Sequence, residues 1–200
     1  MANFISEDDI EQAVLQKLQT DYGFQCLNCF TAKPETLPDG SNRNNKRQVI
    51  LTDRLRSAVR RLNPDLPDSA IDAAVDQITQ PRRSISTIAA KNELDALIRN
   101  GFATDNENDQ GRTEPCRMRF IDFNEPNQNE FLAVSQLWIQ GEHGYRRPDI
   151  LIYINGLPLV FIELKNSNVK LKSAYDGNLN DYKKDVPQLF HANAFCILSN

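Results

Sequence analysis

Two carboxylates and one lysine border two apolar segments in the last third of the sequence. Asp149 directly precedes the apolar run at 150–154, and Glu163 and Lys165 follow the run at 159–162. Continuous apolar runs of this length are typical of strands buried on both faces of a sheet. Charges at the end of such a sheet are costly to bury and need a compensating partner. We favour a divalent metal held by the two carboxylates; a partly solvated ion pair between the lysine and a carboxylate is the alternative.

The turn between the two runs decides whether the carboxylates can share a metal. Asn155-Gly156 is a strong signal for a β-hairpin. A plain two-residue loop would place the two carboxylates on opposite faces of the sheet, because side chains alternate along a strand. The metal hypothesis therefore requires an odd-numbered loop or a β-bulge. We expect a three-residue loop over 154–156, and a loop over 155–157 would serve equally.

Hydrophobic periodicity predicts elements whose order fits an α/β domain. Helical patterns cover residues 7–20, 49–62, 68–78, 89–99 and 173–184. Strand-like runs lie at 24–30, 117–123, 131–139, 150–154, 159–162 and 195–198. We expect a single domain over residues 1–200. It has a helical insertion at 41–110, and the segment 117–200 contains the core of a mixed sheet with the hairpin.

The helical insertion carries no catalytic motif. Its apolar helix faces predict a helical layer packed beside the sheet, and the polar stretch at 104–115 predicts an irregular connection. Five of its arginines are expected to contact DNA or other domains: Arg54, Arg56, Arg60, Arg82 and Arg83.

The overall composition describes a globular chain with a locally basic surface. A net charge of −4 argues against a general nucleic-acid coat protein. The second half is nevertheless rich in basic residues, including Arg146 and Arg147 beside Asp149, which suits a site that holds phosphate. No apolar stretch is long enough to cross a membrane, and the first residues lack the features of a secretory signal. We expect a cytoplasmic protein.

The four cysteines do not form a recognisable metal site. Cys26 and Cys29 make one Cys-x-x-Cys pair, and neither a second pair nor a His-x-x-x-His motif accompanies Cys116 and Cys196. The pair lies in a strand-like apolar run, not before a helix as in a redox motif. We therefore expect buried structural thiols.

Pro148-Asp149 and Glu163-Leu164-Lys165 resemble the PD-(D/E)xK motif of a large class of nucleases. Their surroundings resemble, more specifically, the amino-terminal nuclease region of the restriction (R) subunit of type I restriction–modification enzymes. The segments that carry this resemblance are 62–64, 121–123, 146–150, 155–159, 162–166, 182–185 and 187–190. The resemblance spans nearly the whole chain and implies a restriction-endonuclease-like α/β fold, with a mixed central sheet flanked by helices.

This resemblance implies a magnesium-dependent site. Asp149 and Glu163 would bind Mg²⁺, for which Mn²⁺ can substitute, together with the backbone carbonyl of Leu164. Lys165 would orient or help to deprotonate the attacking water and stabilise charge on the phosphate.

Two helices are expected to complete the site. Many members of the class add a carboxylate from the first helix; we choose Glu11, which lies closer to the apolar face, over Glu7, which suits an ordinary complement to the helix dipole. R subunits also carry Gln-x-x-x-Tyr on the helix after the hairpin, where this chain has Asn178 and Tyr182. The asparagine is one methylene shorter than the family's glutamine. A solvated amide and a packing tyrosine are the alternatives.

The resemblance also implies partners that this chain does not contain. They are double-stranded DNA and the methyltransferase and specificity subunits of the same complex, with no membrane involved. The sequence has no G-x-x-x-x-G-K-[S/T] loop, so ATP would bind only to motor domains expected beyond residue 200. A different hypothesis is a nuclease-like fold that serves as a DNA-binding or assembly module with little activity in isolation.

Overall fold

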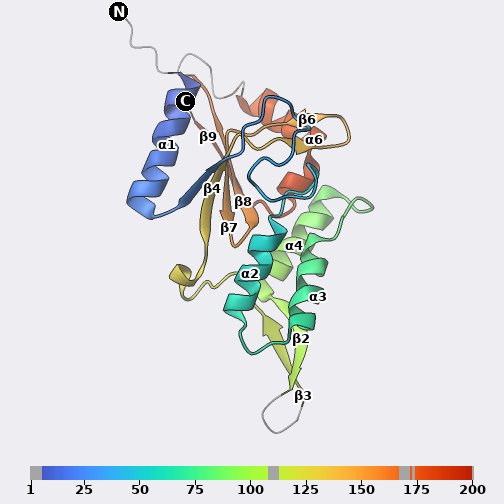
Figure 1. Cartoon of the computed structure of the whole chain (residues 1–200). Helices are drawn as coiled ribbons and strands as arrows, with labels where there is room; N and C mark the ends of the chain where they lie inside the picture. Colours follow the sequence, from blue (N-terminus) through green and yellow to red (C-terminus); the bar gives the residue numbers. More distant parts are fainter. Residues whose placement is uncertain (1–5, 108–112, 167–171, 173, 200) are drawn as a thin grey trace, which may run out of the picture.

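The computed structural model describes residues 6–107, 113–166, 172 and 174–199, and its centre is a five-stranded sheet (Figure 1). The strands lie in the order β1 (Gln25–Asn28), β4 (Phe131–Ser135), β7 (Ile150–Ile154), β8 (Leu157–Leu164) and β9 (Phe195–Ser199). Strand β7 is antiparallel to both of its neighbours, whereas β1 is parallel to β4 and β9 is parallel to β8. The predicted α/β class with a mixed sheet is confirmed.

Helices cover both faces of this sheet (Figure 1). They are α1 (Glu7–Tyr22), α2 (Thr52–Leu62), α3 (Asp68–Thr79), α4 (Thr87–Asn100) and α6 (Asn180–Asp185). A π-helical turn, η2 (Ala174–Leu179), leads into α6, and two 3₁₀ turns lie at η1 (Pro126–Gln128) and η3 (Pro187–Phe190). The helix predicted over 173–184 is thus a π-helical turn followed by a short α-helix.

Strand β7 divides the core into two layers by simple alternation. Ile150 and Ile152 belong to a small cluster against the apolar side of α1, whereas Leu151 and Tyr153 belong to the large cluster on the other face. Helix α1 begins with a capping box, in which Ser6 and Asp9 bond reciprocally. The sheet is therefore buried on both faces, as the continuous apolar runs predict.

The segment predicted as a strand over 117–123 has a different structure. Residues 117 and 118 belong to β3 (Thr113–Met118), which pairs with β2 (Phe102–Glu107) in a separate antiparallel sheet. The connection predicted over 104–115 is therefore wrong for 104–107 and 113–115, which are strand residues, and its centre at 108–112 lies outside the described residues. Residues 119–123 are irregular although Phe120 and Ile121 are buried.

Side chains replace the strand ladder in this irregular segment. The carboxylate of Asp122 accepts bonds from the next turn's backbone, Asn63 accepts from the N–H of Arg119, and Asn129 donates to the carbonyl of Asp122. Burial alone did not distinguish a strand from such a side-chain-supported loop. The remaining short strands, β5 (Ile139–Gln140) and β6 (Tyr145–Arg146), form a third small sheet after β4 has ended, whereas one strand is predicted over 131–139.

The helical insertion is anchored on the hairpin between β7 and β8. The backbone N–H of Leu51, at the start of α2, donates to the carbonyl of Gly156 at 2.9 Å. The side chain of Asn155 donates to the carbonyl of Phe120 and accepts from the backbone N–H of Glu130. The turn therefore joins the sheet, the insertion and the irregular segment.

Most of the insertion's arginines form ion pairs or hydrogen bonds within the protein, so they do not form an open DNA-binding surface. Arg54 pairs with Glu130, Arg56 pairs with Asp72, and Arg60 binds Asp68 and the carbonyl of Leu66. Arg82 is buried and bonds three backbone carbonyls, an arrangement that does not favour the predicted contact with DNA or other domains. Arg83 is exposed.

The sheet edges explain two departures from the predicted burial. Cys29 is buried as expected, but Cys26 is exposed because β1 is an edge strand. Strand β9 forms the other edge, and 56% of Phe195 is exposed although a buried strand is predicted there. All four cysteines are free thiols. None of the described helices has the length and hydropathy of a membrane span.

Substitution of two glycines tests the close approach of the hairpin turn to α2. Gly156 and Gly23 both have left-handed φ angles, +80° and +71°, but a Cβ at Gly156 would lie 2.6 Å from the carbonyl oxygen of Leu51 and one at Gly23 would meet nothing within 4 Å. Gly23→Ala should cost about 1 kcal/mol of unfolding free energy from backbone strain, and Gly156→Ala roughly 2 kcal/mol more. Urea denaturation measures both; equal losses would contradict the close approach.

Candidate active site

A two-residue turn and a β-bulge together set the register of the hairpin. Asn155 and Gly156 have φ angles of +51° and +80°, as in a type I′ turn, and Ile154 pairs directly with Leu157. The predicted three-residue loop is therefore wrong. Instead, the register shifts further along the hairpin, where one additional residue of β8, Leu159, has no partner on β7.

The bulge at Leu159 supplies the change of parity that a shared metal requires. Beyond it, Ile152 pairs with Val160 and Ile150 pairs with Ile162. Continuing this register by one residue places Asp149 opposite Glu163. A shared metal requires either an odd-numbered loop or a β-bulge, and the hairpin has the β-bulge.

Asp149 directly precedes β7, and its carboxylate takes the place of a strand carbonyl as a hydrogen-bond acceptor for β8. Its Oδ2 accepts a 2.6 Å hydrogen bond from the backbone N–H of Leu164, and its own carbonyl accepts from the N–H of Gln136 at 3.0 Å. Both neighbouring strands thus fix Asp149.

Glu163 is almost fully buried, with 4% of its surface exposed. Its Oε1 accepts 2.9 Å bonds from the ammonium group of Lys165 and from the amide of Asn178. Lys165 also donates to the carbonyl of Leu164 at 2.9 Å. The second carboxylate oxygen of Glu163, Oε2, is buried and has no hydrogen-bond partner. A buried anionic oxygen without a partner is costly, so this atom points to a ligand.

The two acidic candidates on α1 occupy different places. Glu7 accepts a 3.0 Å bond from the backbone N–H of Asn166, just beyond β8. Glu11 is buried, with 4% of its surface exposed, and accepts a bond from the side-chain amide of Gln136. Its charge contributes to raising the pKa of Asp149, so Glu11 is electrostatically coupled to the site.

Gln136 is a residue of the site that sequence reasoning missed. It follows β4 in the left-handed conformation, with φ +57°. From there its backbone N–H binds the carbonyl of Asp149 and its side chain binds Glu11. A left-handed glutamine has no sequence signature, because glycine and asparagine are the usual residues in this conformation.

The π-helical turn brings Asn178 to the site. Asn178 lies within η2, and its amide reaches Glu163 although it is shorter than the family's glutamine. Tyr182, on α6, is buried; its ring packs edge-on against Phe161 and its hydroxyl donates to the carbonyl of Arg147 at 2.7 Å. Burial raises the pKa of the Tyr182 hydroxyl, and the charge of Glu163 adds to the shift.

Arg146 and Arg147 are held by contacts within the protein. Arg146 binds Asp185 through its Nε at 2.7 Å, so its charge is balanced locally. The guanidinium of Arg147 lies over the rings of Phe30 and Trp138, 5.2 Å and 4.8 Å from their centroids. Among the described residues, Arg146 forms ion pairs with carboxylates, whereas Arg147 forms none.

Comparison with known proteins identifies the family. Residues 4–200 match the family described as the type I restriction enzyme R protein N terminus. The chain belongs to this family. It is 34% identical over 206 residues to the HindI endonuclease subunit of a type I restriction enzyme from Haemophilus influenzae, covering 98% of this chain and 18% of that protein. It is 29% identical over 199 residues to the putative MjaIXP endonuclease subunit from Methanocaldococcus jannaschii, with 96% and 18% covered.

Electrostatics in this R protein N terminus centre on Asp149. Burial raises the pKa of its carboxyl to about 7, with the charge of Glu163 adding to the shift, while the Leu164 N–H and the Lys165 ammonium oppose it. Burial also raises the pKa of Glu11. For Lys165, burial lowers the pKa, but the bond to Glu163 and the neighbouring carboxylates outweigh this effect and the pKa is raised. The lysine is therefore a cation within an acidic site.

The donor set fits a hard divalent cation. Glu163 Oε2 has no partner, Asp149 is nearby across the hairpin, and the carbonyl of Leu164 retains a second lone pair. Within the described residues, no three His, Cys, Asp or Glu side chains gather closely enough to hold a metal. The protein ligands available at this point are thus two carboxylates and a backbone carbonyl, with water for the remaining positions.

The raised pKa of Asp149 predicts how stability depends on pH without metal. A carboxyl whose pKa rises on folding stabilises the protein below its unfolded pKa of about 3.9, and this contribution is lost as pH rises through the folded value. The free energy of unfolding should therefore fall by roughly 1–3 kcal/mol between about pH 5 and pH 8. Asp149→Asn should remove most of this fall in thermal melts at each pH.

Asp95→Asn, at an exposed carboxylate of α4, serves as the matched control and should leave the slope unchanged. Mg²⁺ should restore stability in the wild type at the upper end of this range, because it competes with the proton for Asp149. A pH profile that is identical in Asp149→Asn would contradict the coupling.

Proposed function

We propose that this chain is the DNA-cleaving domain of a type I restriction enzyme endonuclease subunit, hydrolysing phosphodiester bonds of double-stranded DNA with Mg²⁺. One observation carries the proposal: the bulge at Leu159 brings Asp149 opposite Glu163, and Glu163 presents a buried oxygen without a partner. An ion pair of Lys165 alone does not account for it, because Lys165 binds the other oxygen.

The residues divide into those that hold the metal and those that position them. Asp149, Glu163 and the carbonyl of Leu164 would hold Mg²⁺, and Mn²⁺ could substitute. When bound, the ion supplies a Lewis acid that polarises the phosphate and lowers the pKa of water. Glu11 would not touch the metal directly. It would influence the metal site through its hydrogen bond to Gln136, or through a water.

We assign Lys165 a role in acting on the reacting groups. Its ammonium group has three donors, of which two bind Glu163 and Leu164. The third can orient the attacking water or bind a phosphate oxygen as negative charge develops there. Because its pKa is raised, the lysine acts as a cation that stabilises charge, and proton removal falls to a carboxylate or to a second water.

The rest of the reaction belongs to a longer protein and its complex. The chain spans 18% of the length of its curated relatives. ATP binding and DNA translocation are therefore proposed for other parts of the subunit, and methylation and target recognition for the methyltransferase and specificity subunits. We expect the complex to act in the cytoplasm.

The first prediction of this proposal concerns the three charged residues. Asp149→Ala, Glu163→Ala and Lys165→Ala should each reduce plasmid cleavage in the reconstituted complex by about 100-fold or more. DNA-stimulated ATP hydrolysis should remain unchanged in all three. Calorimetric titration with Mg²⁺ should show that binding is lost in the two carboxylate variants. Robust cleavage by any of the three variants would refute the assignment; intact DNA binding without metal binding or cleavage in the wild type would favour an assembly module.

A second prediction separates Asn178 from its neighbour Asn180. Asn178 donates to Glu163, whereas Asn180, two residues later, donates to the carbonyl of Asp176 at the surface. Losing a bond to a charged group costs about 1.5–3 kcal/mol, so Asn178→Ala should slow cleavage by roughly 10- to 100-fold. Asn180→Ala should cleave at the wild-type rate. Equal effects of the two variants would show that the amide has no part in positioning Glu163.

A further inference from the structure

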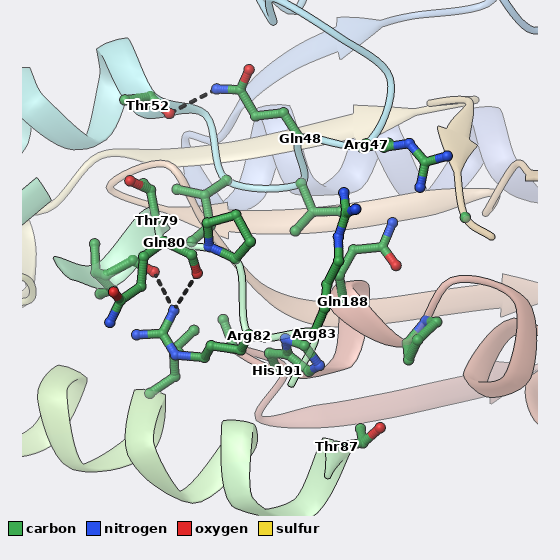
Figure 2. A pocket seen from close by; sticks show the side chains of 18 of the residues that line it. Arg47, Gln48, Thr52, Thr79, Gln80, Arg82, Arg83, Thr87, Gln188 and His191 are labelled. Atoms are coloured by element: carbon green, nitrogen blue, oxygen red, sulfur yellow. Dashed lines mark hydrogen bonds between the residues drawn. The ribbon is translucent and has the colours of Figure 1, made fainter. Parts of the chain in front are cut away.

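A cavity of about 660 Å³ lies away from the candidate active site, between the helical insertion and the end of the nuclease core (Figure 2). Three segments contribute most of its lining, namely the loop before α2, the α3–α4 connection and the η3 turn, and Gly141 and Glu142 between β5 and β6 add a fourth. Figure 2 labels Arg47 and Gln48 from the first segment, Arg82 and Arg83 from the second, and Gln188 and His191 from the third. The Gln48 amide is turned to Thr52, and the Arg82 guanidinium is turned to the carbonyls of Ile78 and Gln80. It contains none of the residues assigned to DNA cleavage.

Positive charge gathers in this cavity although the chain as a whole is acidic. Arg47, Arg82 and Arg83 line it together with the carboxylate of Glu142, and the charge of Arg82 is balanced by Glu93, while the net charge of the chain is −4. Neither Arg47 nor Arg83 forms an ion pair among the described residues, and Arg83 is exposed. Two arginines without an ion-pair partner at one cavity favour an anionic ligand, and planar guanidinium groups suit phosphate oxygens in particular.

Arg82 fixes this wall of the cavity. It is buried, with 8% of its surface exposed, and donates to the carbonyls of Gln77, Ile78 and Gln80, which end α3. It also pairs with Glu93 on α4. Its Nε is buried without a partner. Arg82 therefore holds the connection rigidly between two helices, so that the next residue, Arg83, is presented from an ordered backbone.

The inner part of the cavity is apolar. Ile50, Ile78 and Leu94 line it and are buried members of the core, and Pro81 and Pro187 add rigid apolar surface. A cavity of a few hundred cubic ångströms with an apolar interior and a few polar groups is typical of a site for a small organic ligand. The lining combines these apolar residues with a larger number of polar ones, which suits a ligand with both an apolar part and a polar, anionic part.

We propose that this cavity binds a nucleoside 5′-phosphate, with its base against the apolar wall and its phosphate at Arg47 and Arg83. A DNA duplex is too wide to enter a cavity of this volume, and inorganic phosphate would leave the apolar wall uncovered. The proposal does not depend on the nuclease assignment, because it uses none of the residues that would hold Mg²⁺.

Calorimetric titration of the 200-residue chain tests this proposal. The probes are AMP, GMP, CMP and UMP, with adenosine and inorganic phosphate as the two halves of the ligand. At least one monophosphate should bind more tightly than either half by about tenfold or more. Arg47→Ala and Arg83→Ala should each weaken that binding by about tenfold or more. Arg99→Ala, an exposed arginine of α4 that pairs with Asp95, is the matched control and should bind like the wild type.

A second readout places the ligand in the cavity. The chain has two histidines, and His191 lines the cavity whereas His143 does not. The ring signals of His191, assigned with His143→Gln, should shift on addition of the nucleotide that binds. Asp149→Asn should bind it unchanged, which keeps this test separate from the nuclease assignment.

Three results would overturn the proposal. The first is that no monophosphate binds at about 1 mM, an affinity of roughly −4 kcal/mol. The second is that inorganic phosphate binds as tightly as the best nucleotide. The third is that a short DNA duplex displaces the nucleotide and loses affinity in Arg47→Ala and Arg83→Ala to the same extent, which would make the arginines part of a DNA-binding surface.

Discussion

One residue inserted into β8 determines whether this protein has a site at all. The turn at Asn155-Gly156 is the two-residue type whose twist matches the strands, and without correction it would leave Asp149 and Glu163 on different faces. Leu159 restores the parity, and its carbonyl is satisfied from β9's side by the N–H of Ala194 and the amide of Asn193. The bulge is thus bonded into the fold, and the position of β9 depends on it as much as the active-site geometry does.

Placing the two carboxylates opposite each other has an electrostatic cost, and groups on the surrounding elements reduce it. Asp149 and Glu163 are close enough for each other's charge to matter and are shielded from water, so the folded chain favours a proton on Asp149 up to about pH 7. The Leu164 N–H, the Lys165 ammonium and the Asn178 amide oppose this cost without removing it. The proposed divalent cation would remove it, because its charge compensates both carboxylates.

Local patterns in the sequence predicted the hairpin, the two carboxylates, the lysine and the order of the main elements, because each depends on residues close together in the chain. Contacts between distant segments were harder. No periodicity indicates that Gln136 adopts a left-handed conformation, or that Arg82 is buried as the end of α3. The strand predicted at 117–123 failed for a related reason: burial of Phe120 and Ile121 is the same in a strand as in a loop supported by Asp122 and Asn129. The cavity, built mainly from three such segments, lies outside what single-sequence patterns describe.

The π-helical turn before α6 brings Asn178 to Glu163, at the position where the resemblance implies a glutamine. An α-helix advances fewer residues per turn than a π-helix, so widening one turn alters which side chains face the sheet. Asn178 lies in that wide turn and bonds Glu163, while Tyr182, on the regular helix that follows, packs on Phe161. The shorter amide reaches because the backbone carries it there. Asn178 therefore supplies a donor at Glu163 Oε1, and Oε2 remains the oxygen to which the proposed metal would bind.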